Sequence, residues 1–338
     1  MAHYGDVLAE HAALHAAVGV VDLSFRSRLC LIGKDRQAFL HGQVTNNIRD
    51  LRTGQGCYTA LVTAKGRLQS DLNVYCLAEE LLLDFEPGLS ADVAGRFEKF
   101  IIAEEVQAVD VAPHYGLLTV QGPKSAEVVQ RLGLGMILPE QALHFSKASD
   151  ATIGDVYCTH HRRGSAVGFD LFVPSAALAA VADKLIAAAK DLGGRACGWN
   201  ALELVRVEAG IPRFGADMDE TNLAPESGIE SRAISYSKGC YIGQEVIARI
   251  RTYGQVARAL RGLVLDGDPG TLPARSAKLL LDGKEVGFIT SVITSPAFHR
   301  NLALGYVRRE CNEPGTQLRV LDGELETSAV VTALPFRF

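Results

Sequence analysis

Eight consecutive residues in the second half of the chain combine a thiol, two glycines, an amide and three further ionisable groups. In order they are Lys238, Gly239, Cys240, Tyr241, Ile242, Gly243, Gln244 and Glu245. Glycine adopts backbone angles closed to other residues and lets another group approach the main chain closely. A lysine beside a cysteine favours the thiolate, which is the nucleophilic and metal-binding form. A tight turn with a half-buried cysteine is the simpler interpretation, but the glycine and polar neighbours favour a chemical role for Cys240.

The composition restricts the class of protein. Hydrophobic residues make up 48% of the 338 residues and charged residues 22%, as in soluble globular proteins. The net charge of −5 gives no electrostatic sign of nucleic-acid binding. Neither a membrane span nor a signal peptide is expected from the apolar runs or the first residues. The seven cysteines, at positions 30, 57, 76, 158, 197, 240 and 311, include no CxxC pair, which argues against a zinc site or a disulfide framework and favours a cytoplasmic location.

The length predicts two or three domains, and the hydrophobic pattern predicts mixed elements in each. Helices are expected at about residues 3–17, 90–101, 175–192 and 200–209. Strands are expected at residues 28–32, 57–63, 68–77, 81–85, 106–111 and 116–120. Such an alternation favours an α+β fold with antiparallel sheets, and neither a dinucleotide fingerprint nor a P-loop is present. After residue 254, short strands with Asp-Gly turns at 266–267, 282–283 and 322–323 predict a separate small β-domain.

Short segments in a fixed order carry a family resemblance. They are GVVDLS at residues 19–24, FL and TN at 39–40 and 45–46, GP at 122–123, RVEAGIP at 206–212 and LGYV at 304–307. Over nearly the whole length, the chain resembles the aminomethyltransferase superfamily, to which the glycine-cleavage T-protein belongs. The KGCYIGQE segment resembles the signature of its YgfZ branch, folate-binding proteins implicated in iron–sulfur cluster assembly and repair. T-proteins carry a cysteine-free version of this turn, so Cys240 is the residue that differs.

The resemblance implies a three-domain cloverleaf of α+β class around a folate pocket, with antiparallel sheets and a small C-terminal β-barrel. On this basis we expect a discontinuous folate-binding domain from residues 1–50 plus 140–250. A second α+β domain is expected at 51–139, and the barrel at 255–338. The order of helices and strands predicted from the sequence agrees with this division into parts.

The resemblance also assigns residues to a site for tetrahydrofolate or a one-carbon derivative. T-proteins place an acid pair before a strand to supply the catalytic carboxylate. Here Ser70 replaces the first acid, and Asp71 matches the second. Tyr58, thirteen residues upstream, matches a tyrosine that lines the folate pocket. Asp170 takes the place of a family glutamate and Glu208 lies in the RVEAGIP segment, so both are expected to bind the cofactor.

One family residue of the pocket is replaced. The arginine expected just before the Glu208 segment is Leu202 in this chain, which removes a charge-assisted contact with a pterin or an amino-acid group. This replacement disfavours aminomethyl transfer but not folate binding. Simpler roles stay open for the other residues: Asp71 as a turn cap, Tyr58 as a strand aromatic, and Asp170 and Glu208 without a ligand.

The end of the motif has its own alternative. Gln244 and Glu245 begin a segment in which Arg249 follows Glu245 by four residues. A helix start with a Glu245–Arg249 ion pair explains this spacing without a ligand. Such a helix does not exclude a functional role for the motif.

Three functions follow from these residues and the resemblance. The leading hypothesis is a tetrahydrofolate-binding accessory protein for iron–sulfur cluster assembly or repair, with Cys240 as the key thiol, because a thiolate is a soft ligand. Clusters normally need about four thiolates, so Cys240 would be a transient ligand completed by an assembly or client protein, and no resident metal is expected. The alternatives are a folate-dependent aminomethyl or one-carbon transferase using Asp71, and a thiol redox or sulfur-transfer enzyme using Cys240. The oligomeric state stays open.

Overall fold

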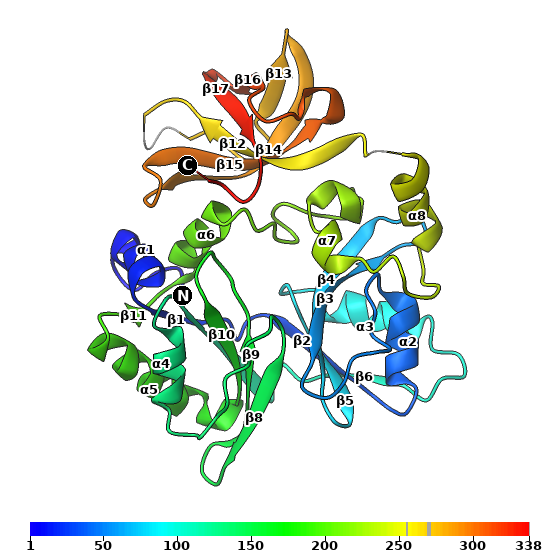
Figure 1. Ribbon diagram of the computed structural model, residues 1–338, viewed down its shortest axis with the longest axis vertical. Helices are drawn as coiled ribbons and strands as arrows, with labels where there is room; N and C mark the ends of the chain where they lie inside the picture. The colour runs from blue at the N-terminus through cyan, green and yellow to red at the C-terminus, as the bar shows by residue number, and fades with distance from the viewer. Residues whose placement is uncertain (255, 269–271, 338) are drawn as a thin grey trace.

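The computed structural model describes residues 1–254, 256–268 and 272–337. The chain forms three units arranged as a cloverleaf, with two open sheets below and a closed β-barrel above them (Figure 1). Among the described residues, neighbouring strands are antiparallel except for β1 (Gly19–Asp22) and β11 (Arg195–Ala196), which pair in parallel. The predicted α+β class, antiparallel sheets and C-terminal barrel are therefore confirmed.

The first sheet presents one apolar face and one polar face. Its strands are β2 (Ser27–Ile32), β3 (Gly56–Val62), β4 (Leu68–Cys76), β5 (Glu80–Phe85) and β6 (Gln107–Asp110), in the spatial order β3-β4-β5-β2-β6. Helices α2 (Arg36–Gln43) and α3 (Ser90–Glu98) cover the face that carries Leu72 and Val74. Because successive side chains alternate between faces, Asp71, Asn73 and Tyr75 point to the other face.

The second sheet lies beside the first. Its remaining strands are β7 (Tyr115–Gln121), β8 (Phe145–Asp150), β9 (Gly154–His160) and β10 (Gly168–Pro174), giving the order β11-β1-β7-β10-β9-β8. Helices α4 (Ser125–Gln130) and α5 (Leu178–Asp191, preceded by the short 3₁₀ turn Ser175–Ala177) pack on its outer face. Val181, Leu185 and Ala189 of α5 recur at helical spacing and are buried in that core.

The two sheets share an apolar core that closes the space behind the polar faces. Cys30 and Tyr75 of the first sheet pack in one cluster with Leu117 and Phe172 of the second. The ring centroids of Tyr75 and Phe172 are 5.6 Å apart in an edge-to-face arrangement. This contact between the sheets fixes the distance between the polar residues of the first sheet and those of the second.

The third unit is the closed barrel. Its strands are β12 (Arg258–Leu265), β13 (Lys278–Leu281), β14 (Lys284–Ser295), β15 (Arg300–Arg308), β16 (Gln317–Asp322) and β17 (Leu325–Thr332), closed in the order β12-β15-β14-β13-β16-β17, with a 3₁₀ turn at Arg309–Cys311. The predicted turn at 282–283 joins β13 to β14, and both of its residues have positive φ, as a tight hairpin requires. The first and last residues of the predicted barrel domain, 255 and 338, lie outside the described residues.

Short helices join the three units. They are α1 (Val7–Ala16), α6 (Trp199–Glu208), the 3₁₀ turn Ala224–Ser227, α7 (Glu230–Ala233) and α8 (Gln244–Tyr253). Helix α6 lies between the second sheet and the barrel, and α7 lies over β3 and β4 (Figure 1). In the described part of the chain, no helix has the length and apolar character needed to cross a membrane.

The sheets divide the chain differently from the predicted domains. Strand β2, expected in the unit 1–50 plus 140–250, pairs with β5 and β6 of the unit expected at 51–139. Strand β7, expected in that second unit, pairs instead with β1 and β10. The reason is that strand partners are chosen by long-range register, which hydrophobic patterns along the sequence do not report. We therefore propose that the domain boundaries follow the sheets. The chain passes from the second sheet to the first after β1 and returns to the second sheet before β7.

Candidate functional site

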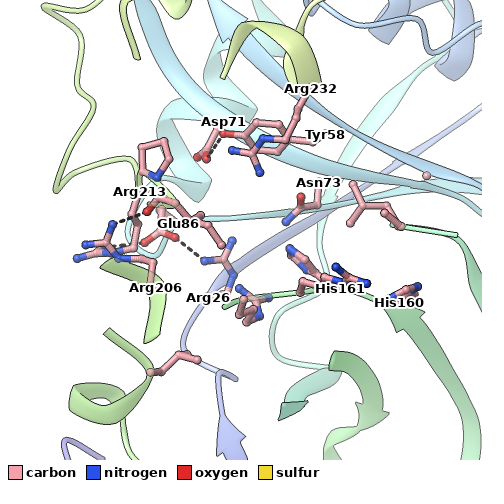
Figure 2. Close-up of a pocket in the computed structure, with 18 of the residues that line it drawn as sticks. Arg26, Tyr58, Asp71, Asn73, Glu86, His160, His161, Arg206, Arg213 and Arg232 are labelled. Carbon is pink, nitrogen blue, oxygen red and sulfur yellow. Dashed lines mark hydrogen bonds and ion pairs between the residues drawn. The ribbon is translucent and has the colours of Figure 1, made fainter. Parts of the chain in front are cut away.

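A cavity of about 410 Å³ lies where the two sheets, α6 and the chain after α6 meet. Segments far apart in the sequence line it (Figure 2). The polar faces of both sheets contribute, and its charged or hydroxylated lining residues include Arg26, Tyr58, Asp71, Glu86, Arg163 and Arg213. The cavity therefore exists only when the two sheets and α6 are assembled.

Tyr58 and Asp71 meet inside the cavity. They lie on adjacent strands, and the Tyr58 hydroxyl donates a hydrogen bond of 2.8 Å to Oδ2 of Asp71. Burial raises the pKa of Asp71 to about 6, and the charge of Glu86 adds to this effect, while Tyr58 and Arg26 oppose it. A carboxyl group with this pKa exchanges its proton near neutral pH, as a general base must.

Glu86 is a cavity residue that the sequence analysis missed. It follows β5 and lies between two arginines: Oε1 accepts from Arg26 at 2.5 Å and Oε2 accepts from Arg213 at 3.1 Å (Figure 2). Arg26 also donates from Nε to Asp84 at 2.9 Å. The available signal was the pair of acids at 84 and 86 in an otherwise apolar run, because alternate residues of a strand share one face.

The wall opposite the sheets is aromatic and basic. The guanidinium of Arg213 lies 5.1 Å from the ring centroid of Trp199, within the range of a cation–π contact. On the other side of the cavity, the guanidinium of Arg232 lies 5.1 Å from the ring centroid of Tyr58. Flat aromatic and guanidinium surfaces on two sides suit a flat heterocyclic ring.

An arginine on α6 ties this wall to the barrel. Arg206 donates from Nη1 to Asp217 at 2.6 Å and also pairs with Glu203. The other oxygen of Asp217 accepts from the hydroxyls of Thr290 and Ser291 on β14, at 2.6 and 2.7 Å. The barrel thus holds the cavity wall through one buried carboxylate.

Two buried lining atoms have no hydrogen-bond partner among the described residues. They are Nε2 of His160 and Nε of Arg213. Buried polar atoms in native proteins are nearly always hydrogen-bonded, to protein, water or a ligand. Nε of Arg213 faces the Glu203 carboxylate at 3.7 Å, beyond hydrogen-bond distance, so Nε2 of His160 is the clearer sign of a polar ligand in the cavity.

The KGCYIGQE motif lies outside the cavity lining, on the face near α2 and α8. Cys240 is exposed, whereas Cys57 is half-buried and the other five cysteines are buried. Lys238 does not act mainly on Cys240: its Nζ donates to the backbone carbonyls of His41, Val44 and Asn46 at 2.5, 2.6 and 2.9 Å. The lysine expected to activate the thiol is therefore first an anchor for the turn.

Lys238 also affects the thiol of Cys57, a residue that the sequence analysis did not assign to the site. Cys57 lines the cavity, and burial raises its pKa to about 12, although the charge of Lys238 opposes this. Burial in turn lowers the pKa of Lys238 to about 8. The charge of Lys238 therefore acts on the thiol of Cys57, which lines the cavity.

The second half of the motif begins a helix, as one alternative predicted. Gly243 caps α8 with φ +86°, and Tyr241 is buried. Among the described residues there is no ion pair between Glu245 and Arg249, so the predicted stabilising pair is not part of this helix start. Nor do the described residues contain a cluster of three or more His, Cys, Asp or Glu side chains placed to hold a metal ion.

Comparison with known proteins follows the same division of the chain. Two family models match it: the GCVT N-terminal domain over residues 3–238 and the glycine cleavage T-protein C-terminal barrel domain over residues 258–337. The chain belongs to the glycine-cleavage T-protein family.

Relatives in the T-protein family match over nearly the whole chain. An aminomethyltransferase of Parafrankia sp. is 30% identical, covering 96% of this chain and 87% of that protein. An aminomethyltransferase of Halothermothrix orenii is 25% identical, covering 98% and 92%. The crystal structure of the glycine cleavage system aminomethyltransferase T from Bartonella henselae has the same fold, with a TM-score of 0.88, 23% identity and coverage of 99% of this chain and 91% of that one.

Asp170, expected from the T-protein pattern as a folate ligand, lies behind the cavity wall. It is fully buried on β10, and its oxygens accept from Nε and Nη2 of Arg163 at 3.1 and 2.6 Å. Nδ1 of His161 lies 2.9 Å from the same carboxylate. Burial alone raises the pKa of a carboxyl group, but Arg163 and His161 hold that of Asp170 well below its usual range. Arg163 and His161, not Asp170, line the cavity.

Glu208, also expected as a T-protein folate ligand, lies away from the cavity. One oxygen lies 2.7 Å from Nε2 of His11 on α1, and the other accepts from the hydroxyl of Ser295 on β14. All three side chains are buried. Glu208 therefore joins α1, α6 and the barrel, because its position on α6 turns it away from the sheets. By contrast Leu202, which replaces the T-protein arginine, does line the cavity.

Proposed function

We propose that this protein binds tetrahydrofolate, or a one-carbon derivative of it, in the cavity between its two sheets. The observation that carries the proposal is the Tyr58–Asp71 pair, which presents a carboxylate within an aromatic and arginine-rich wall. A pterin offers N–H donors to such a carboxylate and a flat ring to Tyr58 and Trp199. The acidic tail of a folate suits Arg213 and His160, since Nε of Arg213 and Nε2 of His160 form no hydrogen bond among the described residues. When bound, a tetrahydrofolate supplies the nitrogens that carry a one-carbon unit.

We expect Asp71→Asn to weaken tetrahydrofolate binding by at least tenfold, and Tyr58→Phe by a smaller factor. Loss of a charge-assisted hydrogen bond to a bound ligand costs about 1.5–3 kcal/mol, and every 1.4 kcal/mol is a factor of ten. Calorimetric titration with tetrahydrofolate under reducing conditions measures this. Tyr253→Phe is the matched control, because Tyr253 is 88% exposed and outside the cavity. Equal affinities for wild type and Asp71→Asn would place the folate elsewhere.

We further propose that the bound folate serves an accessory role in iron–sulfur cluster assembly or repair, with Cys240 as the working thiol. The support is that Cys240 is the one exposed thiol, on a turn that Lys238 ties to α2. A thiolate is a soft ligand for iron. Because clusters normally need about four thiolates, an assembly or client protein would complete the set.

Cys240→Ser is expected to leave folding and folate binding unchanged, because the side chain is exposed and outside the cavity. The same change should lower the activity of an iron–sulfur dehydratase in cells that carry the variant in place of the native chain. Cys57→Ser is the control that removes a thiol from the cavity instead of from the surface. Full dehydratase activity with Cys240→Ser would remove the thiol from the proposed function.

A second candidate, a one-carbon transferase using Asp71, has a specific observation in its favour. The pKa of Asp71 is about 6, so its basic form grows as the pH rises from 5 to 7. A transferase would therefore gain rate over that interval and lose it in Asp71→Asn. The assay supplies tetrahydrofolate and an aminomethyl donor and follows methylene-tetrahydrofolate. Turnover that needs Asp71 but is unaffected by Cys240→Ser would favour this candidate over the accessory role. Absence of turnover would reject the transferase and limit the role of Asp71 to binding the folate.

A further inference from the structure

His41 of α2 has one ring nitrogen fully used and one free. The side chain is 5% exposed, and Nδ1 lies 3.3 and 3.2 Å from the backbone N–H groups of Ile48 and Arg49. A ring nitrogen that accepts from N–H groups carries no proton, so the proton of the neutral ring is on Nε2. Among the described residues, Nε2 has no hydrogen-bond partner. His41 therefore presents an unused N–H donor.

This donor faces the motif. A Cβ atom built on Gly239 would lie 3.9 Å from Nε2 of His41, and no other atom beyond the chain neighbours is found within 4 Å. Gly239 thus leaves a notch with the imidazole N–H on one side. Cys240, the next residue, is exposed, and among the described residues its sulfur forms no hydrogen bond to His41 or to any other group, so no such bond holds its side chain away from the notch. A histidine that is far away in the sequence is a spatial neighbour of the thiol turn.

The position of His41 relative to the motif is fixed by a hydrogen bond, and its imidazole ring carries no charge. Lys238 donates to the carbonyl of His41 itself, so one side chain fixes both the motif and the end of α2. Burial lowers the pKa of His41, and the charges of Lys238 and Arg49 lower it further, while Asp50 opposes them. At neutral pH the ring is therefore uncharged and keeps its N–H donor on Nε2.

We propose that Nε2–H of His41 donates a hydrogen bond to the anionic sulfur of Cys240 across the Gly239 notch. This inference rests on the proposed function of Cys240, and it makes His41 a positioning residue for the thiolate. The bond stabilises the anion that binds iron or attacks an electrophile, because hydrogen bonds to charged acceptors are the strong ones. It also explains the value of a glycine at 239, since a side chain there would occupy the space between donor and sulfur.

The test is the rate at which iodoacetamide alkylates Cys240 in the full chain at pH 7, followed by peptide mass spectrometry. Asparagine at 41 places an oxygen where Nδ1 accepts and removes the donor, whereas glutamine reaches the Nε2 position with an amide N–H. We expect His41→Asn to slow alkylation about three- to tenfold, since part of the gain in thiolate is offset by its lower nucleophilicity. His41→Gln should recover most of the rate. A purely structural role would not produce this difference between two amides.

A second variant approaches the notch from the other side. Gly239→Ala fits at ordinary contact distance from His41, so it should fold normally and still slow alkylation. Rates equal to wild type in both His41→Asn and Gly239→Ala, or equal losses in the asparagine and glutamine variants, would overturn the proposal.

The outcome is separable from that of the proposed function. Slow alkylation in His41→Asn with full dehydratase activity in Cys240→Ser would keep the hydrogen bond and reject the cellular role of the thiol. Unchanged alkylation together with lost dehydratase activity in Cys240→Ser would do the reverse.

Discussion

Asp170→Asn is expected to destabilise the folded protein by about 3–5 kcal/mol. Removing one partner of a buried ion pair leaves an uncompensated charge, and losses of that size are typical. Here the charge left behind is the guanidinium of Arg163, which donates hydrogen bonds to both oxygens of Asp170. Its Nη2 also lies 3.9 Å from Oδ2 of Asp84. Urea unfolding at pH 7, followed by circular dichroism, measures the change in the free energy of unfolding.

The same carboxylate gives the prediction a pH dependence. Because the pKa of Asp170 is held below its value in the unfolded chain, its contribution is complete above about pH 4 and is lost as the solution is acidified further. The difference between wild type and Asp170→Asn should therefore shrink below pH 4. Asp155→Asn is the control, since Asp155 pairs with Lys147 at the surface and its loss should not shift the unfolding midpoint. A destabilisation as small as that control would contradict the buried network.

Gly243→Ala is expected to cost about 2–5 kcal/mol and to displace the motif. A non-glycine residue in the left-handed region costs roughly 1–2 kcal/mol, and crowding in a packed site adds roughly 1–3 kcal/mol. Gly243 has φ +86°, and an added Cβ would lie 2.5 Å from the carbonyl oxygen of Thr63 and 2.9 Å from Val62. Thermal unfolding measures the cost, and faster proteolysis within residues 238–253 would report the displaced turn.

Gly228→Ala separates the two contributions. Gly228 has φ +72°, but nothing lies within 4 Å of an added Cβ. It should therefore show only the conformational cost, about 1–2 kcal/mol. If Gly243→Ala is no worse than Gly228→Ala, the contact between the motif and the β3–β4 turn does not constrain the motif.

The sequence predicted which residues lie close together best where the evidence was local. Tyr58 and Asp71 are separated by one hairpin, so strand alternation and the family pattern together place them on one face. The turn at Gly243 was likewise recognisable from its glycine and the helix that follows. Local patterns do not, however, say which distant strand or helix lies opposite.

Two residues that do not line the cavity show that limit. Asp170 and Glu208 were assigned to the cavity from their places in family segments, but their partners, Arg163 on one side and His11 on the other, decide where they point. Lys238 stands two residues from Cys240 in the sequence, yet its ammonium group is used by carbonyls at the end of α2. Only the packed structure shows such partners, because side-chain length lets a charged group reach past its neighbours.

The ties between Asp217 and the barrel have a consequence for synthesis. A chain emerging from the ribosome carries Arg206 and Asp217 well before Thr290 and Ser291, the two hydroxyls that Asp217 accepts from. Domains tend to fold in order during synthesis, and partly folded chains expose hydrophobic surface that promotes aggregation. The cavity wall should therefore not be fixed in place until β14 has been translated. A chain that stops before the barrel should aggregate, even though every residue lining the cavity is present.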